Sequence, residues 1–125
     1  MPYINLKTNL QDFEDKEASI LELIVSKTKQ ILKKDEKVTS VLLEKVPFNN
    51  WYINKKNEFT FFLEIKITKD SNTKEEKALY IKEIFEGFKA LNIKINKASY
   101  ILIDEIAGNS WGYGGITQEY RYSKS

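Results

Sequence analysis

The feature that most constrains the fold of this chain is an internal repeat with a period of about 60 residues. The two tryptophans of the chain lie 60 positions apart, as Trp51 and Trp111, each preceded by a short polar pair. The same offset superposes two apolar stretches: Val38 falls on Ala98, Val41 on Ile101, Leu43 on Ile103 and Val46 on Ile106. A fixed offset of this kind indicates a duplicated supersecondary unit. We therefore expect a single domain over residues 1–125, with one repeat at about 1–57 and a second at about 58–122.

Each repeat has the pattern of a strand, a helix and a second strand. Apolar alternation and β-branched runs predict strands at residues 3–7, 38–46, 59–68 and 98–106, and helical spacing predicts helices at 16–34 and 73–92. Thr73 and Glu76 have the spacing of a capping box at the start of the second helix. Residues 33–37 are expected to form a charged, solvated turn, 51–57 an irregular segment or short hairpin, and 116–122 a last short strand.

Right-handed crossovers in both units would place the two helices on one face of a single sheet. The fold class is therefore expected to be α+β, a duplicated βαβ unit that forms a four-stranded mixed sheet. The other face of that sheet, expected to be rich in Phe and Ile, is left without cover and needs a partner. This pattern predicts an oligomer.

The composition excludes several kinds of chemistry. The chain has no cysteine and no histidine, which removes disulfides, thiolate catalysis, the usual general base and the commonest metal ligand. No Asp/Glu cluster of the calcium-loop kind is present, so no metal site is expected. The net charge is +2 and Arg121 is the sole arginine, which does not favour nucleic-acid binding. Without a long apolar run or a secretory-signal pattern, we expect a cytoplasmic protein with no membrane association.

The start of the chain suggests a specific chemistry. Pro2 has the small, rigid side chain that suits removal of Met1, and this removal would leave a secondary amine at the end of an apolar strand. An ordinary α-amino group has a pKa of roughly 7.7–8.0, which burial or nearby positive charge lowers. Such an amine can take a proton from a carbon next to a carbonyl and return it elsewhere. Alternatively, Pro2 only begins an edge strand, where proline is tolerated.

Near the other end of the chain, a strand at residues 99–106 is followed by a glycine-rich turn, Trp111–Gly112–Tyr113–Gly114–Gly115. Together with the Met1–Pro2 start and the duplicated unit, this segment resembles the tautomerase superfamily. The second half is similar to one subunit of 4-oxalocrotonate tautomerase. The full duplicated length is similar to macrophage migration inhibitory factor and 5-carboxymethyl-2-hydroxymuconate isomerase, which are trimers.

The resemblance implies roles for four residues. Pro2 matches the N-terminal proline that serves as general base, and Tyr100 matches an arginine or tyrosine that reaches into a neighbouring subunit's pocket. Trp111 matches a phenylalanine that walls the pocket and keeps the amine in an apolar setting. Lys37, expected at the end of the first helix, is the nearest match, one position out of register, to a pocket lysine of the cytokine-like members. The carboxylate-binding arginines of 4-oxalocrotonate tautomerase have no counterpart, so dehalogenation, which also depends on arginines, is not expected.

The resemblance thus implies a cofactor-independent homotrimeric tautomerase, which interconverts keto and enol (or double-bond) isomers of a small carbonyl acid. The alternative is a non-catalytic oligomeric binding protein of the same fold, which the missing arginines and a retained Met1 would favour. A third interpretation is an unrelated βαββαβ domain that binds RNA through Phe59, Phe61 and Phe62. The sequence leaves open the substrate, the removal of Met1 and whether the region around Trp51 forms a second site.

Overall fold

The computed structural model, which describes residues 2–124, contains a four-stranded sheet with the strand order β2-β1-β5-β6. The strands are β1 (Tyr3–Thr8), β2 (Ser40–Lys45), β5 (Phe61–Thr68) and β6 (Tyr100–Ile106). Strand β1 is parallel to β2, and β5 is parallel to β6. The two pairs meet through the antiparallel neighbours β1 and β5, so the sheet is mixed.

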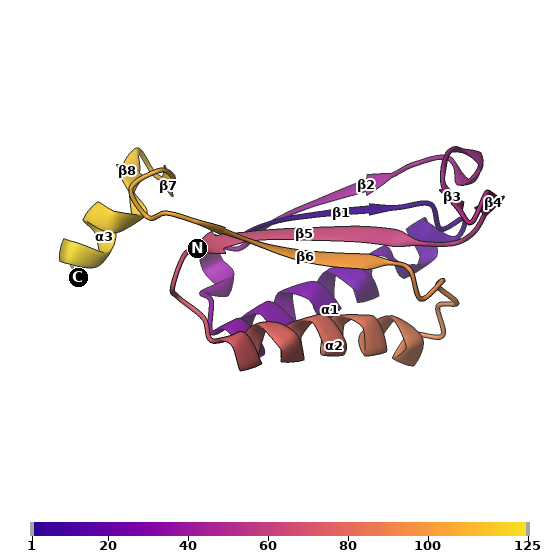
Figure 1. Cartoon of the computed structure of the whole chain (residues 1–125), viewed down its shortest axis with the longest axis horizontal. Coiled ribbons are helices and arrows are strands. Elements are labelled where there is room, and N and C mark those ends of the chain that lie inside the picture. The colour runs from indigo at the N-terminus through magenta and orange to yellow at the C-terminus, as the bar shows by residue number, and fades with distance from the viewer. Residues whose placement is uncertain (1, 125) are drawn as a thin grey trace.

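The two long helices, α1 (Phe13–Leu32) and α2 (Lys74–Ala90), cover the same face of the sheet (Figure 1). The predicted α+β fold class is therefore confirmed. The core between sheet and helices is apolar, with Ile4, Leu6, Phe61, Leu63, Ile65 and Ile67 from the sheet and Ile20, Ile24, Ile84 and Phe88 from the helices. Burying each such side chain contributes about 1.5–3 kcal/mol. Because a slip of one residue would turn these side chains to the other face, the core also fixes the strand register.

Local sequence determines where α2 begins and where α1 ends. Helix α2 begins with the predicted capping box, in which Thr73 Oγ1 accepts from the Glu76 N–H and the Glu76 carboxylate accepts from the Thr73 N–H. Helix α1 ends where Lys33 adopts a φ of 61°, the left-handed conformation that commonly closes a helix. The residue after this turn, Lys34, is buried. Both helix ends lie beneath the end of the sheet at which β1 begins (Figure 1).

The prediction for the uncovered sheet face is wrong in one respect. The phenylalanine and isoleucine side chains of β5 mostly face the helices, and Phe61 stacks on Phe88 with ring centroids 4.5 Å apart. Since Phe61 is fully buried, the aromatic platform proposed for RNA stacking does not exist. The uncovered face alternates large apolar with charged side chains: Tyr3, Leu42, Phe62, Tyr100 and Leu102 with Glu44, Glu64, Lys66 and Asp104.

Two short hairpins and a final helix complete the chain. One hairpin joins β3 (Tyr52–Ile53) and β4 (Lys56–Asn57), and the other joins β7 (Gly112–Tyr113) and β8 (Ile116–Thr117). The predicted strand at 116–122 is wrong beyond Thr117, because helix α3 (Gln118–Lys124) follows directly. Thr117 Oγ1 accepts from the Tyr120 N–H at 3.1 Å, a cap that favours a helix start. Hairpin β7–β8 and α3 project beyond the sheet at the end where the chain begins (Figure 1).

Two single-turn helices connect these elements: η1 (Glu36–Val38) precedes β2, and η2 (Phe48–Asn50) precedes β3. Of the two structures expected for residues 51–57, an irregular segment or a short hairpin, the pairing of β3 with β4 shows the hairpin. None of the described helices combines the length and the apolar character needed to cross a lipid bilayer.

Candidate active site

Pro2 is buried at the end of the sheet where β1 begins. Its carbonyl oxygen accepts a hydrogen bond of 3.2 Å from the Ser40 N–H, which ties Pro2 to the start of β2. Continuing the β1–β5 register by one residue places Pro2 beside Ile67, and continuing the strand alternation places it on the helix-covered face. The residue that the sequence singled out is thus held in a largely apolar setting. Met1 and its predicted removal lie outside the described residues.

A cavity of about 480 Å³ opens beside Pro2. Three segments line it: the start of the chain at Pro2 and Tyr3, residues 37–40 around η1, and residues 111–113 at the start of the last hairpin. The structure therefore brings three of the four predicted site residues, Pro2, Lys37 and Trp111, to one cavity. It adds Tyr113, whose place within the glycine-rich motif was the only sequence signal for it.

Trp111 forms a fixed part of the cavity wall. Its indole Nε1 donates to Thr68 Oγ1 at 3.2 Å, which attaches the last hairpin to the end of β5. The hairpin turns sharply, with Gly114 and Gly115 at φ values of 65° and 79° that glycine adopts without strain. At Gly112 the constraint is steric, because a Cβ there would overlap the carbonyl group of Ile116. The glycine motif therefore sets the position of the wall.

Lys37 reaches the cavity from η1 and not from the end of the first helix, where the sequence placed it. Helix α1 ends at Leu32, and Asp35 starts η1 by accepting a hydrogen bond of 3.0 Å from the Lys37 N–H. The Lys37 side chain is exposed, and it is the one charged side chain among those that line the cavity. As a compact and mobile cation, it can approach an anionic group bound there.

Tyr100 is not part of this cavity within one chain. It begins β6 opposite Phe62, whereas the register places Pro2 level with Glu105, five residues farther along the strand. At the rise of a β-strand this separation is about 16 Å. The Tyr100 side chain is 67% exposed on the uncovered sheet face. Contact with a Pro2 cavity would therefore require a second protomer.

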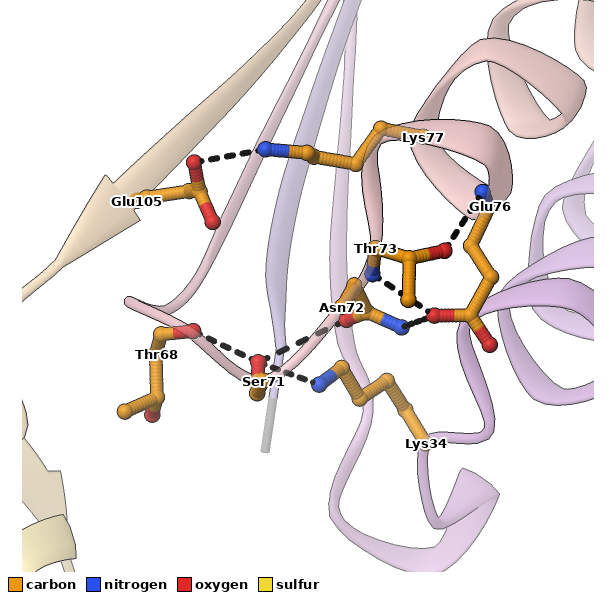
Figure 2. Close-up of polar contacts among 8 residues, drawn as sticks. All are labelled: Lys34, Thr68, Ser71, Asn72, Thr73, Glu76, Lys77 and Glu105. Atoms are coloured by element: carbon orange, nitrogen blue, oxygen red, sulfur yellow. Dashed lines mark hydrogen bonds and ion pairs between the residues drawn. The ribbon is translucent and has the colours of Figure 1, made fainter.

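The structure contains a buried lysine within the turn at residues 33–37, which was predicted to be solvated. Lys34 is 9% exposed, and its Nζ donates to Ser71 Oγ at 2.8 Å (Figure 2). Burial lowers the pKa of the Lys34 ammonium below its ordinary 10.5, and the charges of Glu76 and Glu105 offset part of this effect. No sequence signal distinguishes Lys34 from its neighbours, because its burial follows from the left-handed turn at Lys33 and the packing of the helix ends.

The carboxylates near Lys34 are engaged by other partners. Glu105 pairs with Lys77 at 2.8 Å, and Glu76 caps α2 and accepts from Asn72 Nδ2 at 3.2 Å (Figure 2). Within the described part of the chain, Lys34 has no carboxylate at ion-pair distance. The helix-covered side of the sheet therefore contains, at this end, a cation that is only partly neutralised.

Hydrogen bonds connect this buried cation with the cavity wall. Ser71 Oγ, which accepts from Lys34, donates to the carbonyl oxygen of Thr68 at 2.5 Å. Thr68 in turn accepts from the Trp111 indole. Because Thr68 follows Ile67, the neighbour of Pro2, the three groups Pro2, Lys34 and Trp111 occupy the same end of the sheet.

The region around Trp51 does not repeat this chemistry. A shallow depression of about 330 Å³ lies near the first hairpin, lined by Asn9, Gln11, Lys45, Val46, Pro47 and Phe48. The strand that follows the hairpin, β5, begins in the middle of the chain, so its backbone nitrogens are amides. Amide nitrogens do not act as bases, so no backbone nitrogen near the first hairpin can supply an amine of the kind predicted at Pro2.

The chain has the fold of the tautomerase superfamily. A fused 4-OT described as an asymmetric trimer superposes with a TM-score of 0.84 at 15% identity, over 96% of this chain and 98% of that one. A malonate semialdehyde decarboxylase inhibited by 3-bromopropiolate gives a TM-score of 0.79 at 12% identity, over 98% and 97% of the two chains. A macrophage migration inhibitory factor-like protein from Entamoeba histolytica gives 0.77 at 15% identity, over 93% and 97%.

No family model and no curated protein sequence matches the chain. The sequence identities to the solved structures are low, so the similarity establishes the fold. The reaction has to be inferred from the residues around the cavity.

Proposed function

We propose that this protein is a cofactor-independent tautomerase that moves a proton between isomers of a small carbonyl acid, with Pro2 as the general base. The observation that supports the proposal most strongly is the position of Pro2, buried at the wall of a 480 Å³ cavity together with Trp111 and Tyr113. The proposal requires removal of Met1, since only then is the Pro2 nitrogen a secondary amine.

In the proposed reaction, the Pro2 nitrogen takes a proton from the carbon next to the substrate carbonyl. The electron pair of that C–H bond moves to the carbonyl oxygen, and the resulting enolate or dienolate is protonated at oxygen or at a second carbon. Substrate and product are isomers, so no oxidant, reductant or cofactor is consumed. An amine whose pKa lies near the working pH is an efficient base for this transfer.

The surroundings of Pro2 suit this role. Burial disfavours an ammonium at Pro2, and the partly neutralised Lys34 ammonium at the same end of the sheet acts in the same direction. Both effects favour the unprotonated form of the amine. Lys37, on the open side of the cavity, can stabilise the negative charge that develops on the substrate oxygen.

We further propose that the active form is a homotrimer in which Tyr100 of one protomer completes the Pro2 cavity of the next. The support is the exposed position of Tyr100 on the uncovered sheet face, together with the trimeric state of the fused 4-OT neighbours. A phenol at this position would donate a hydrogen bond to the enolate oxygen.

The general-base role is tested with protein whose Met1 has been removed, as verified by mass spectrometry. Ketonisation of enol phenylpyruvate and isomerisation of 2-hydroxymuconate are measured for the wild type and for Pro2→Ala. We expect kcat/KM to fall by about 10²–10⁴-fold in the variant. Equal rates in the two proteins would exclude the role of Pro2 and favour the non-catalytic oligomeric binding protein.

Covalent labelling tests the same amine independently of turnover. One structural neighbour of this fold was inactivated by 2-oxo-3-pentynoate, which is itself a carbonyl acid. We expect this reagent to add to Pro2 in the processed protein and not in a form that retains Met1. Peptide mapping that finds the adduct on a lysine, or finds none, would contradict the assignment.

A further inference from the structure

Helix α3 contacts the segment 111–113, which lines the Pro2 cavity, at two points. The Gln118 N–H donates to the carbonyl oxygen of Trp111 at 3.0 Å, and Arg121 Nη2 donates to the carbonyl oxygen of Tyr113 at 2.6 Å. The Arg121 guanidinium also lies over the Tyr113 ring, 3.9 Å from its centroid. The Arg121 side chain is therefore in direct contact with Tyr113, one of the residues that line the cavity.

The same helix contains every buried side-chain atom that lacks a hydrogen-bond partner in the described part of the chain. These atoms are Nε2 and Oε1 of Gln118, whose side chain is almost completely buried, and Nε of Arg121. Buried polar atoms in folded proteins are nearly always paired, so such a group requires an explanation. Three of them on one short helix, next to one cavity wall, indicate that this place suits a polar group of a ligand.

Arg121 is the sole arginine of the chain, and its charge has no carboxylate partner among the described residues. Of the five N–H groups of its guanidinium, one donates to the Tyr113 carbonyl, and the buried Nε–H has no acceptor. The planar fork of an arginine matches the two oxygens of a carboxylate. The amide of Gln118, three residues earlier on the same helix, can add a further donor.

We propose that α3 supplies the carboxylate-binding group of the Pro2 cavity and that Arg121 selects anionic ligands there. This inference rests on the proposed function in taking the ligand to be a carbonyl acid. In this arrangement the carboxylate binds at the edge of Tyr113 against the Arg121 guanidinium, and the carbonyl carbon chain extends toward Pro2. Binding requires a small movement of the 112–115 turn, because the Arg121 Nε is buried.

The test compares two ligands that differ in charge at one group, trans-cinnamate and trans-cinnamamide. Neither can tautomerise, so binding is measured without turnover. Titrations follow the indole N–H signals of Trp111, at the cavity wall, and of Trp51, far from it, by nuclear magnetic resonance. In the wild type we expect the Trp111 signal to move and cinnamate to bind about ten- to a hundredfold more tightly than the amide.

The decisive variant is Arg121→Gln, with Arg121→Lys as a conservative partner. We expect Arg121→Gln to lose most of the preference for cinnamate, the remainder being due to Lys37, and to bind cinnamamide as the wild type does. Arg121→Lys should retain more of the preference. Lys82→Gln, which removes one exposed positive charge from the outer surface of α2, should keep the full preference.

The inference is overturned if Arg121→Gln prefers cinnamate as strongly as the wild type does, or if the wild type shows no preference. It is also overturned if Arg121→Gln weakens both ligands equally, which would indicate a structural role. Pro2→Ala is expected to keep the preference. Because ligand binding is measured without catalysis, an inactive wild type would refute the proposed reaction while the titrations still decide the role of Arg121.

Discussion

At the scale of single residues, two lysines that are adjacent in the sequence differ in their exposure to solvent. Lys33 is exposed and donates to the Gln30 carbonyl, whereas Lys34 is buried against Ser71. A buried ammonium loses hydration that one hydroxyl partner does not replace. Lys34 is therefore expected to reduce the stability of the folded chain at neutral pH, which is typical of a group retained for electrostatic work in a site.

The burial of the Lys34 ammonium predicts that the free energy of unfolding depends on pH. Since burial lowers the folded-state pKa of Lys34, the unfolded chain binds more protons between the folded value and the ordinary 10.5. The free energy of unfolding therefore rises with pH through this window. Lys34→Met is expected to be more stable than the wild type by about 1 kcal/mol at pH 7, with the difference shrinking toward pH 10.

Urea unfolding at a series of pH values measures this difference, and Lys33→Met is the matched control. The control removes a charge one position away, where the side chain is exposed, and should shift stability little at any pH. If the stability difference between Lys34→Met and the wild type stays constant from pH 7 to pH 10, the lowered pKa of Lys34 is contradicted.

A buried pair of hydroxyl groups between the two helices gives a second residue-scale prediction. Thr28 Oγ1 donates to the Ile24 carbonyl at 2.7 Å, so the Tyr80 hydroxyl, 2.8 Å away, donates to Thr28. Burial raises the pKa of the Tyr80 phenol, which keeps it a donor. Thr28→Val leaves that donor buried without an acceptor and should cost about 2–3 kcal/mol, whereas Tyr80→Phe should cost about 1 kcal/mol.

Chemical denaturation of the two single variants and the double variant checks this order. The double variant, which removes both partners, should be more stable than Thr28→Val alone. If Thr28→Val is no more destabilising than Tyr80→Phe, the hydrogen bond runs in the other direction or is absent.

At the scale of elements, the last hairpin and α3 form a unit that is connected to the core by few bonds. The Trp111 indole bonds Thr68, and the Glu119 N–H donates to the Gly108 carbonyl at 3.0 Å. Most of the hydrophobic core lies between the sheet and the long helices. The geometry of the cavity wall and the stability of the core are therefore expected to respond to different substitutions.

Gly112→Ala tests this separation. A Cβ at position 112 would overlap the Ile116 carbonyl and force the hairpin open, which displaces Trp111 and Tyr113 from the wall. We expect kcat/KM for enol phenylpyruvate to fall about tenfold or more, with little change in the melting temperature. Gly108→Ala is the matched control, since its Cβ would meet the Glu119 nitrogen at an ordinary 3.4 Å. A large drop in melting temperature for Gly112→Ala would show that the unit is part of the folding core.

At the scale of the whole molecule, the uncovered sheet face is suited to contact between protomers. It exposes Leu42 at 45%, Leu102 at 44% and Tyr100 at 67%. Between them, Lys66 pairs with Glu64 at 3.2 Å and with Asp104 at 3.0 Å, which neutralises much of the charge on this face. A face that is apolar and internally paired is typical of a surface that becomes covered.

Leu102→Lys is therefore expected to convert the proposed trimer to monomers and to abolish tautomerase activity, because Tyr100 could no longer reach a neighbouring cavity. Leu79→Lys provides a matched control, since Leu79 is 46% exposed but lies on α2. Light scattering gives the molar mass of each protein. A wild-type monomer, or an unchanged molar mass in Leu102→Lys, would refute the proposed assembly.

Most of the fold follows from local sequence patterns. The alternation in β5 and the Thr73 capping box predicted elements that the structure contains, because each depends on neighbours a few residues away. The strand predicted at 116–122 failed because Thr117 caps a helix, a local signal that the apolar and aromatic residues obscured. The uncovered sheet face was misjudged because both faces of β5 contain phenylalanine, and only packing against α2 decides that Phe61 is the inner one.

The sequence by itself determined the repeat and the βαβ units, and it indicated the chemistry expected of Pro2 and the sharp turn expected of the glycine motif. These features depend on residue type and spacing. Only the tertiary structure decided which side chains share a cavity. It placed Lys37 and Trp111 beside Pro2, moved Tyr100 to the far end of the sheet, buried Lys34 and set Arg121 behind Tyr113. Such proximities arise where distant segments pack together, and no local pattern encodes the loss of hydration that lowers the pKa of a buried lysine.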